Sequence, residues 1–147
     1  MMSNYKNIVT AVDGSEEAKL ALKKAISIAK ESEANLIITH IIDTRVFATI
    51  EQYDRTVVSK AEEYGKELLE QYKLEAEAAG IENVSTALDF GSPKIKITKS
   101  IAPLYHADLI VVGATGLNAA ERFLIGSVSE NIARRASCDV LLVRKGE

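Results

Sequence analysis

The sequence predicts one α/β domain in which helices cover both faces of a five-stranded parallel sheet. Two features support this prediction. Five short strand-like segments alternate with amphipathic helical segments, which is the order of a parallel sheet with right-handed crossovers. The segment Leu109 to Val112 is apolar at every position, as in a strand that is buried on both faces. No linker or internal repeat divides the chain, so residues 1–147 are predicted to be a single domain.

The first half of the chain contains two strand and helix pairs. Ile8 to Val12 is an apolar strand that ends in the turn Asp13-Gly14-Ser15. The helix after it has acidic residues, Glu16 and Glu17, in its first turn, which suit the helix dipole. The second strand is Leu36 to Ile42. The spacing of three and four predicts that each helix has one apolar face, with Ala18, Ala21, Leu22, Ala25 and Ala29 in the first helix and Val57, Ala61, Tyr64, Leu68, Tyr72, Ala76 and Ala79 in the second.

The second half continues the alternation. Asn83 to Leu88 alternates weakly, as a less buried strand near a sheet edge does. Ser92-Pro93 opens a helix, because proline is favoured in a first turn. The fourth strand is Leu109 to Val112, and the last is Val140 to Val143. The apolar faces of the two helices in this half are predicted to consist of Ile95, Thr98, Ile101, Ala102 and Tyr105, and of Val128, Ile132 and Ala136.

Composition excludes several classes of protein. The net charge of −3 gives no electrostatic reason to expect nucleic acid or an acidic membrane as a partner. No apolar run approaches the ~18 residues of a membrane span, and no signal segment opens the chain, so we expect a cytoplasmic protein. The single cysteine, Cys138, cannot form an internal disulfide. His40 and His106 are far apart, and no His, Cys and carboxylate spacing predicts a metal site made by the protein alone.

The loop after the fourth strand has features that suit a phosphate. Gly113 and Gly116 lack a Cβ, so the backbone can expose its N–H groups there. Gly126-Ser127 then opens a helix, and Ser127 with Glu130 fits a Ser-x-x-Glu capping box. A helix start supplies free N–H groups and the positive end of the dipole. The alternative is an empty loop, in which Gly113 ends the strand and Ser127 is only a helix cap.

The full pattern Gly-x2-Gly-x9-Gly-Ser after an apolar strand resembles the ATP-binding signature of the universal stress protein family. The resemblance extends to Asn7 to Ser15, to Ile38 to Ile42 and to Cys138 to Val143. It implies a doubly wound sheet of order 3-2-1-4-5, with the nucleotide at the carboxyl ends of the strands that end at Asp13 and Gly113. It also implies a role in stress adaptation.

The resemblance assigns roles to individual residues. Asp13 would accept hydrogen bonds from the ribose, although the sequence equally allows Asp13 to start a capping box with Glu16. The resemblance also implies the other contacts: the base would lie against Ala11, Val12, His40 and Ile41, the base and sugar against Val112 and Gly113, and the phosphates against Gly116, Gly126, Ser127, Val128 and Ser129.

One position departs from the family pattern. Many members have histidine or arginine just before the second glycine, whereas this chain has Thr115. The change removes a cation from the phosphate side, and Arg122 in the spacer is a candidate to replace it. The expected cofactor is ATP, with Mg or Mn carried on its phosphates.

Four functions remain open at this point. The first is a nucleotide-dependent regulatory protein. The second is a slow ATPase, since the chain has neither a GxxxxGK-[ST] loop nor an obvious base near Ser127. The third is a phosphoacceptor receiver domain, with Asp89 as acceptor, Thr115 as switch hydroxyl and Lys145 as the paired lysine. The fourth is a member of the same fold that has lost its nucleotide and works through protein contacts.

The last strand also predicts an assembly. Val140 to Val143 is apolar throughout and lies near the chain end. At a sheet edge such a strand would pair with a second copy, so a homodimer is expected, as the resemblance also implies. A covered edge in a monomer is the alternative.

Overall fold

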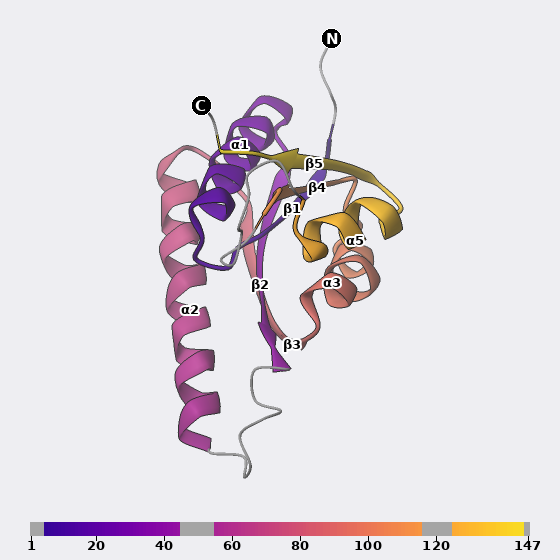
Figure 1. The fold of residues 1–147 in the computed structure, drawn as a ribbon. Coiled ribbons are helices and arrows are strands. Elements are labelled where there is room, and N and C mark those ends of the chain that lie inside the picture. The colour runs from indigo at the N-terminus through magenta and orange to yellow at the C-terminus, as the bar shows by residue number, and fades with distance from the viewer. Residues whose placement is uncertain (1–4, 45–54, 116–124, 146–147) are drawn as a thin grey trace.

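A five-stranded parallel sheet forms the centre of the computed structural model, which describes residues 5–44, 55–115 and 125–145 (Figure 1). The strand order is β3-β2-β1-β4-β5, and every neighbouring pair is parallel. This order confirms the predicted doubly wound topology. The strands are β1 (Asn7–Ala11), β2 (Asn35–Asp43), β3 (Val84–Gly91), β4 (Leu109–Gly113) and β5 (Asp139–Val143).

The helices form a layer on each side of the sheet (Figure 1). One face is covered by α1 (Glu16–Ser32) and α2 (Arg55–Ala78). The other face is covered by α3 (Pro93–Lys96), the π-helical segment η2 (Ile97–Ile101), α4 (Ala102–Leu104) and α5 (Ser127–Arg135). Among the described residues, no helix is both long enough and apolar enough to cross a membrane.

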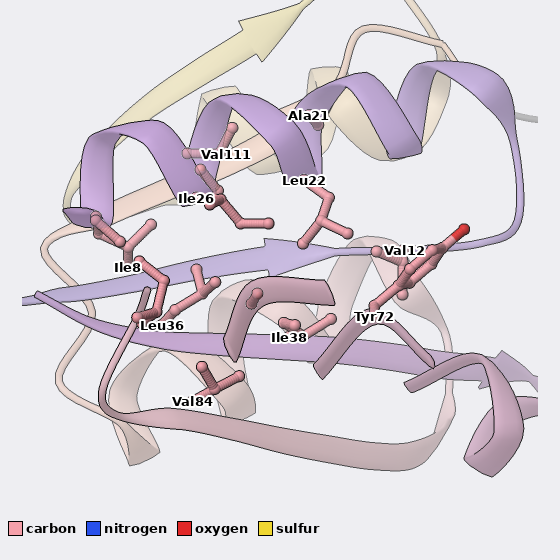
Figure 2. Packing of buried hydrophobic residues seen from close by; sticks show 14 of the residues in the cluster. Ile8, Val12, Ala21, Leu22, Ile26, Leu36, Ile38, Tyr72, Val84 and Val111 are labelled. Carbon is pink, nitrogen blue, oxygen red and sulfur yellow. The ribbon is translucent and has the colours of Figure 1, made fainter. Parts of the chain in front are cut away.

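Alternating strand residues supply a separate hydrophobic core to each face. Ile8 and Leu36 point toward α1 and α2, and Figure 2 shows them packed with Leu22 and Ile26 of α1. Their neighbours Val9 and Ile37 point the other way. We call the two cores the α1–α2 cluster and the α3–α5 cluster. The α3–α5 cluster consists of Val9, Ile37, Ile41, Ile97, Ile101, Ala102, Ile110, Val112 and Ile132, with half-buried side chains such as Ala11 and Val128 packed against it.

Helix α1 begins two residues later than a cap at Asp13 would place it. Its N-cap is Ser15, whose Oγ accepts a hydrogen bond from the Ala18 amide at 3.1 Å. The capping box that the sequence allowed at Asp13 is therefore absent, and the Asp13 side chain has a different role, described below. The helix ends where Glu33 adopts a left-handed conformation, with φ of 55°.

Two apolar faces differ from their predicted composition. Tyr64 of α2 is 51% exposed, although Leu68, Tyr72 and Ala76 of the same stripe are buried. In the third helical region Ile95 is 44% exposed, whereas Ile97, outside the predicted face, is 1% exposed. In this third region the cause is the π-helical segment η2, because its wider turn rotates the buried face away from a spacing of 3.6 residues.

The strand order excludes the receiver-domain alternative. Asp89 lies on β3 at the sheet edge and pairs with Ile41 of β2, so β2 and β1 separate it from β4. Its carboxylate forms an ion pair with Lys96 at 3.3 Å. Thr115, which follows β4, therefore lies too far across the sheet to act with Asp89.

Candidate functional site

The chain leaves β1 and β4 toward opposite faces of the sheet. The two strands are neighbours, with Thr10 opposite Val111. After β1 the chain enters α1 on one face, and after β4 it continues to α5 on the other face (Figure 1). Such a switch point is where open α/β sheets bind ligands. We call the carboxyl ends of β1 and β4, together with the start of α5, the switch edge.

Asp13 closes a tight turn at the end of β1. Its Oδ1 accepts a hydrogen bond from the Ser15 amide at 2.9 Å. Gly14 has φ of +86°, a left-handed conformation that favours glycine, and the Tyr64 hydroxyl lies only 2.5 Å from where a Cβ would be. In the described part of the chain, Oδ2 of Asp13 has no hydrogen-bond partner, so one carboxylate oxygen remains for a ligand.

β2 extends past the end of β1. The last pair between the two strands is Ala11 with Thr39, and the Val12 amide donates to the Thr39 carbonyl at 2.9 Å. In a parallel ladder, alternate residues direct their N–H and C=O to the same neighbour. The main chain of Ile41 therefore faces the space beyond β1, where it can offer one donor and one acceptor.

The predicted base-contacting residues divide between the two faces. Ala11, Ile41 and Val112 belong to the α3–α5 cluster, together with Val128 of α5. Val12 belongs to the α1–α2 cluster, and Gly113 packs against Glu17 of α1. His40 also points to the α2 side, where its Nδ1 is 2.8 Å from the Val12 carbonyl and its ring contacts Tyr64 edge-on. The structure thus brings together Ala11, Ile41, Val112 and Val128, and directs the His40 ring elsewhere.

The two described ends of the loop between β4 and α5, which we call the glycine loop, are held by hydrogen bonds. The Ala114 amide donates to the Val143 carbonyl at 2.8 Å, and the Gly126 amide donates to the Ala114 carbonyl at 2.8 Å. The Ser129 hydroxyl donates to the Gly113 carbonyl. These groups are therefore not available to a phosphate. Gly116 and Arg122 lie outside the described residues.

Helix α5 begins at Ser127, and its N-cap is Gly126. The predicted capping box is wrong, because Ser127 is already the first helical residue and Glu130 instead pairs with Arg134 at 2.8 Å. The Glu130 amide makes the first main-chain bond of the helix, to the Gly126 carbonyl at 2.9 Å. Within the described residues, the amides of Ser127, Val128 and Ser129 have no acceptor, as expected for a first turn. Free amides of this kind at a helix start suit an anion, and they lie at the switch edge.

Comparison with known proteins identifies the family. The sequence profile of the universal stress protein family matches residues 4–144. The chain belongs to the universal stress protein family. A Staphylococcus epidermidis protein that carries the family's name is 51% identical over 146 residues, covering 99% of this chain and 88% of the relative.

Solved universal stress proteins share the whole fold. UspA from Lactobacillus plantarum superposes with a TM-score of 0.84 at 27% identity, covering 97% of this chain and 99% of its own. A universal stress protein in complex with cAMP superposes with a TM-score of 0.75 at 30% identity, covering 98% of this chain and 100% of its own. The fold similarity therefore extends across nearly the whole chain.

Glu17 is a residue of this universal stress protein that sequence reasoning missed as part of the site. It is only 9% exposed, and its Oε1 accepts hydrogen bonds from the Thr115 amide at 2.7 Å and the Thr115 hydroxyl at 2.6 Å. Oε2 accepts the Lys145 amide at 3.1 Å. Burial alone would raise the pKa of Glu17, but these hydrogen bonds outweigh it and hold the pKa below its ordinary value.

A signal for Glu17 was present in the sequence. Glu17 is four residues before Ala21, which starts the series Ala21, Ala25 and Ala29 on the buried stripe of α1. A carboxylate in line with such a stripe is expected to have a specific partner. Thr115 is that partner.

Proposed function

We propose that this universal stress protein binds ATP at the switch edge and acts as a nucleotide-dependent regulatory protein in stress adaptation, in the cytoplasm. The observation that carries the proposal is the first turn of α5. Its three amides lack acceptors in the described part of the chain, and it follows β4, the strand next to β1, after which the turn at Asp13 comes. Phosphates and a ribose therefore have complementary groups at one edge of the sheet.

The phosphate group would be held mainly by the main chain of α5. The amides of Ala114, Thr115 and Gly126 are used within the protein, so the available donors among the described residues are those of Ser127, Val128 and Ser129. The positive end of the helix dipole adds to their attraction for an anion. The Ser127 hydroxyl supplements these amides, whereas the Ser129 hydroxyl is bonded to Gly113.

The base would be recognised by main-chain polarity and apolar walls. Adenine offers a donor and an acceptor side by side, which match the C=O and N–H of a single residue such as Ile41. Ala11 and Val112 lie on the same face as the Ile41 side chain and supply apolar contact. Oδ2 of Asp13 would accept hydrogen bonds from the ribose hydroxyls. The relative solved with cAMP supports an adenine nucleotide as ligand.

Hydrolysis is the alternative activity, and we propose that it is slow at most. Efficient phosphoryl transfer needs a positioned water and strong charge neutralisation. Asp13 is assigned to the ribose, Glu17 already binds Thr115 and Lys145, and Glu130 in the first turn of α5 pairs with Arg134. A divalent ion such as Mg or Mn would arrive on the phosphates and would supply charge neutralisation there.

We also propose that the protein is a homodimer through β5. This strand pairs with β4 and lies at the edge of the sheet. Because Ala114 donates to Val143, alternation directs the N–H groups of Val140 and Leu142 away from β4. The side chains from Val140 to Val143 are half-buried and Asp139 is exposed, so a second copy would cover both polar and apolar surface.

Release of bound nucleotide tests the proposal. Freshly purified protein is denatured, and the supernatant is analysed by chromatography with ATP, ADP and cAMP as standards. We expect ATP or ADP at about one per chain. A parallel titration compares ATP, cAMP and GTP, and we expect ATP to bind more tightly than GTP, because the exocyclic groups of guanine reverse the donor and acceptor pattern. A supernatant without nucleotide, together with no ATP binding in the titration, would favour a member of the fold that has lost its nucleotide.

A further inference from the structure

Glu17 connects three segments that are distant in the sequence. It belongs to the first turn of α1 and is three residues after Gly14. Its carboxylate binds Thr115, which follows β4, and the amide of Lys145, which follows β5. A buried carboxylate is costly unless donors surround it, and three donors surround this one. Glu17 therefore fixes these segments relative to one another.

The main chain of Glu17 also lies against the end of β4, at Gly113. A Cβ at Gly113 would lie 3.0 Å from both the carbonyl carbon and the Cβ of Glu17, and 3.1 Å from its carbonyl oxygen. Gly113 thus allows α1 to approach the end of β4. Side chain and main chain together place the first turn of α1 directly against the beginning of the glycine loop.

The bonds of Glu17 define how the chain enters the glycine loop. Thr115 is the residue before Gly116, and both of its donors, the amide and the hydroxyl, bind one carboxylate oxygen. The other oxygen holds the first residues beyond the edge strand β5. A rearrangement of Thr115 on nucleotide binding would shift the shared carboxylate, and with it the bond to Lys145.

We propose that Glu17 is a positioning residue for Thr115, at the start of the glycine loop, and that its carboxylate couples nucleotide binding to the segment after β5. The inference rests on the proposed nucleotide-binding function. It adds a coupling path that leads from the loop to the strand at the edge of the sheet. Neither Thr115 nor Lys145 needs to touch the nucleotide for this path to operate.

Glu17→Gln tests the proposal, with Glu16→Gln as control. Glutamine keeps the size of the side chain but replaces one acceptor oxygen with an NH₂ group, so it cannot accept from all three donors. Glu16 is exposed and lies in the same helical turn. The measurements are amide hydrogen exchange at Thr115 and Lys145, with and without ATP, and ATP affinity by calorimetry.

We expect Glu17→Gln to speed exchange at both amides and to weaken ATP binding about tenfold, the loss of a charge-assisted hydrogen bond. In the wild type, ATP should change exchange at Lys145, whereas in Glu17→Gln this response should disappear. A role limited to stability would leave the response in place. Glu16→Gln should behave as the wild type does.

The outcomes separate this inference from the proposed function. If the wild type binds no ATP, the proposed function and the coupling both fail, while exchange without ATP still decides whether Glu17 holds the loop. If the wild type binds ATP and Glu17→Gln binds equally well with unchanged exchange, the inference alone is wrong.

Should Glu17→Gln fail to fold, Lys145→Pro removes the donor N–H and keeps Glu17, with Lys145→Ala as control. We expect weaker ATP binding in the proline variant only, and equal binding in both would overturn the coupling.

Discussion

Gly65 of α2 faces the ring of His40 on β2 so closely that a Cβ at residue 65 would lie 2.9 Å from Cδ2 of His40. The same Cβ would lie 2.8 Å from Cδ1 of Leu88 on β3. The His40 ring is fixed by its contact with the Val12 carbonyl at 2.8 Å. A glycine in the middle of this helix therefore lets α2 approach two strands, and the same histidine connects that contact to the strand that ends at the switch edge.

Gly65→Ala should destabilise the protein. Alanine is the better helix former by about 0.5–1 kcal/mol, but forcing a methyl group into a packed interface costs about 1–3 kcal/mol. We expect a net loss of about 1 kcal/mol in the free energy of unfolding, measured by urea denaturation. Leu74→Ala, at a position that is 57% exposed on the same helix, serves as control and should change stability by less than about 0.5 kcal/mol. An increase in stability for Gly65→Ala would contradict the packing at His40.

Substitutions at Ser15 and Asp13 should separate effects on stability from effects on nucleotide binding. Ser15→Ala removes the cap of α1 and should cost about 1 kcal/mol of stability. Asp13→Asn keeps the Oδ1 acceptor for the Ser15 amide, so stability should change little, but it removes the charge that we propose the ribose hydroxyls contact. We expect Asp13→Asn to weaken ATP binding about tenfold by calorimetry, and Ser15→Ala to weaken it much less. The reverse pattern would assign Asp13 a structural role.

Glu17 should make stability depend on acidic pH. Its pKa is held below the ordinary value of 4.5 by the hydrogen bonds from Thr115 and Lys145, which outweigh burial. The unfolded chain therefore binds the proton more readily, and the stabilisation is present above about pH 4.5 and is lost as the pH falls through the lower pKa of the folded protein. Urea midpoints between neutral and acidic pH should fall more steeply for the wild type than for Glu17→Gln. Parallel curves would show that Glu17 does not contribute to the acid sensitivity.

Val140→Pro should block pairing at the edge of the sheet. The N–H of Val140 faces away from β4, so its removal spares the ladder within the chain but denies a donor to a second copy. We expect a monomer by sedimentation equilibrium. Val140→Ala shortens the side chain and keeps the N–H, so it should remain a dimer. A dimeric proline variant would place the interface elsewhere.

The sheet could be predicted from the sequence because its signals are local. The apolar run of β4 and the helical spacing of α1 depend on the burial of each segment alone, and both are confirmed. The π-helical segment η2 was missed because its buried face, with Ile97, depends on packing against α5 rather than on a regular period. The strand order came from the family resemblance, since periodicity does not determine which strands are neighbours.

The local structure of the switch edge was predictable in outline and not in detail. The turn at Asp13 and the helix start near Ser127 follow from glycine and serine positions. Which face each side chain uses follows from strand register, and this is why the His40 ring points toward α2 whereas Ile41 belongs to the α3–α5 cluster. The contact of Glu17 with Thr115 joins residues 98 positions apart, which no local pattern reports.

Calorimetric titration of ATP into the wild type, Ser127→Glu and Ser127→Gln is the most direct test of the switch edge as a phosphate site. Glutamate in the first turn of α5 should stabilise the helix by about 0.3–1 kcal/mol through its interaction with the dipole. The fold should therefore be kept while the new charge repels an anion. We predict that the wild type and Ser127→Gln bind ATP and that Ser127→Glu loses at least about tenfold in affinity at an unchanged or higher melting temperature. Equal ATP affinity in the glutamate and glutamine variants would contradict the account.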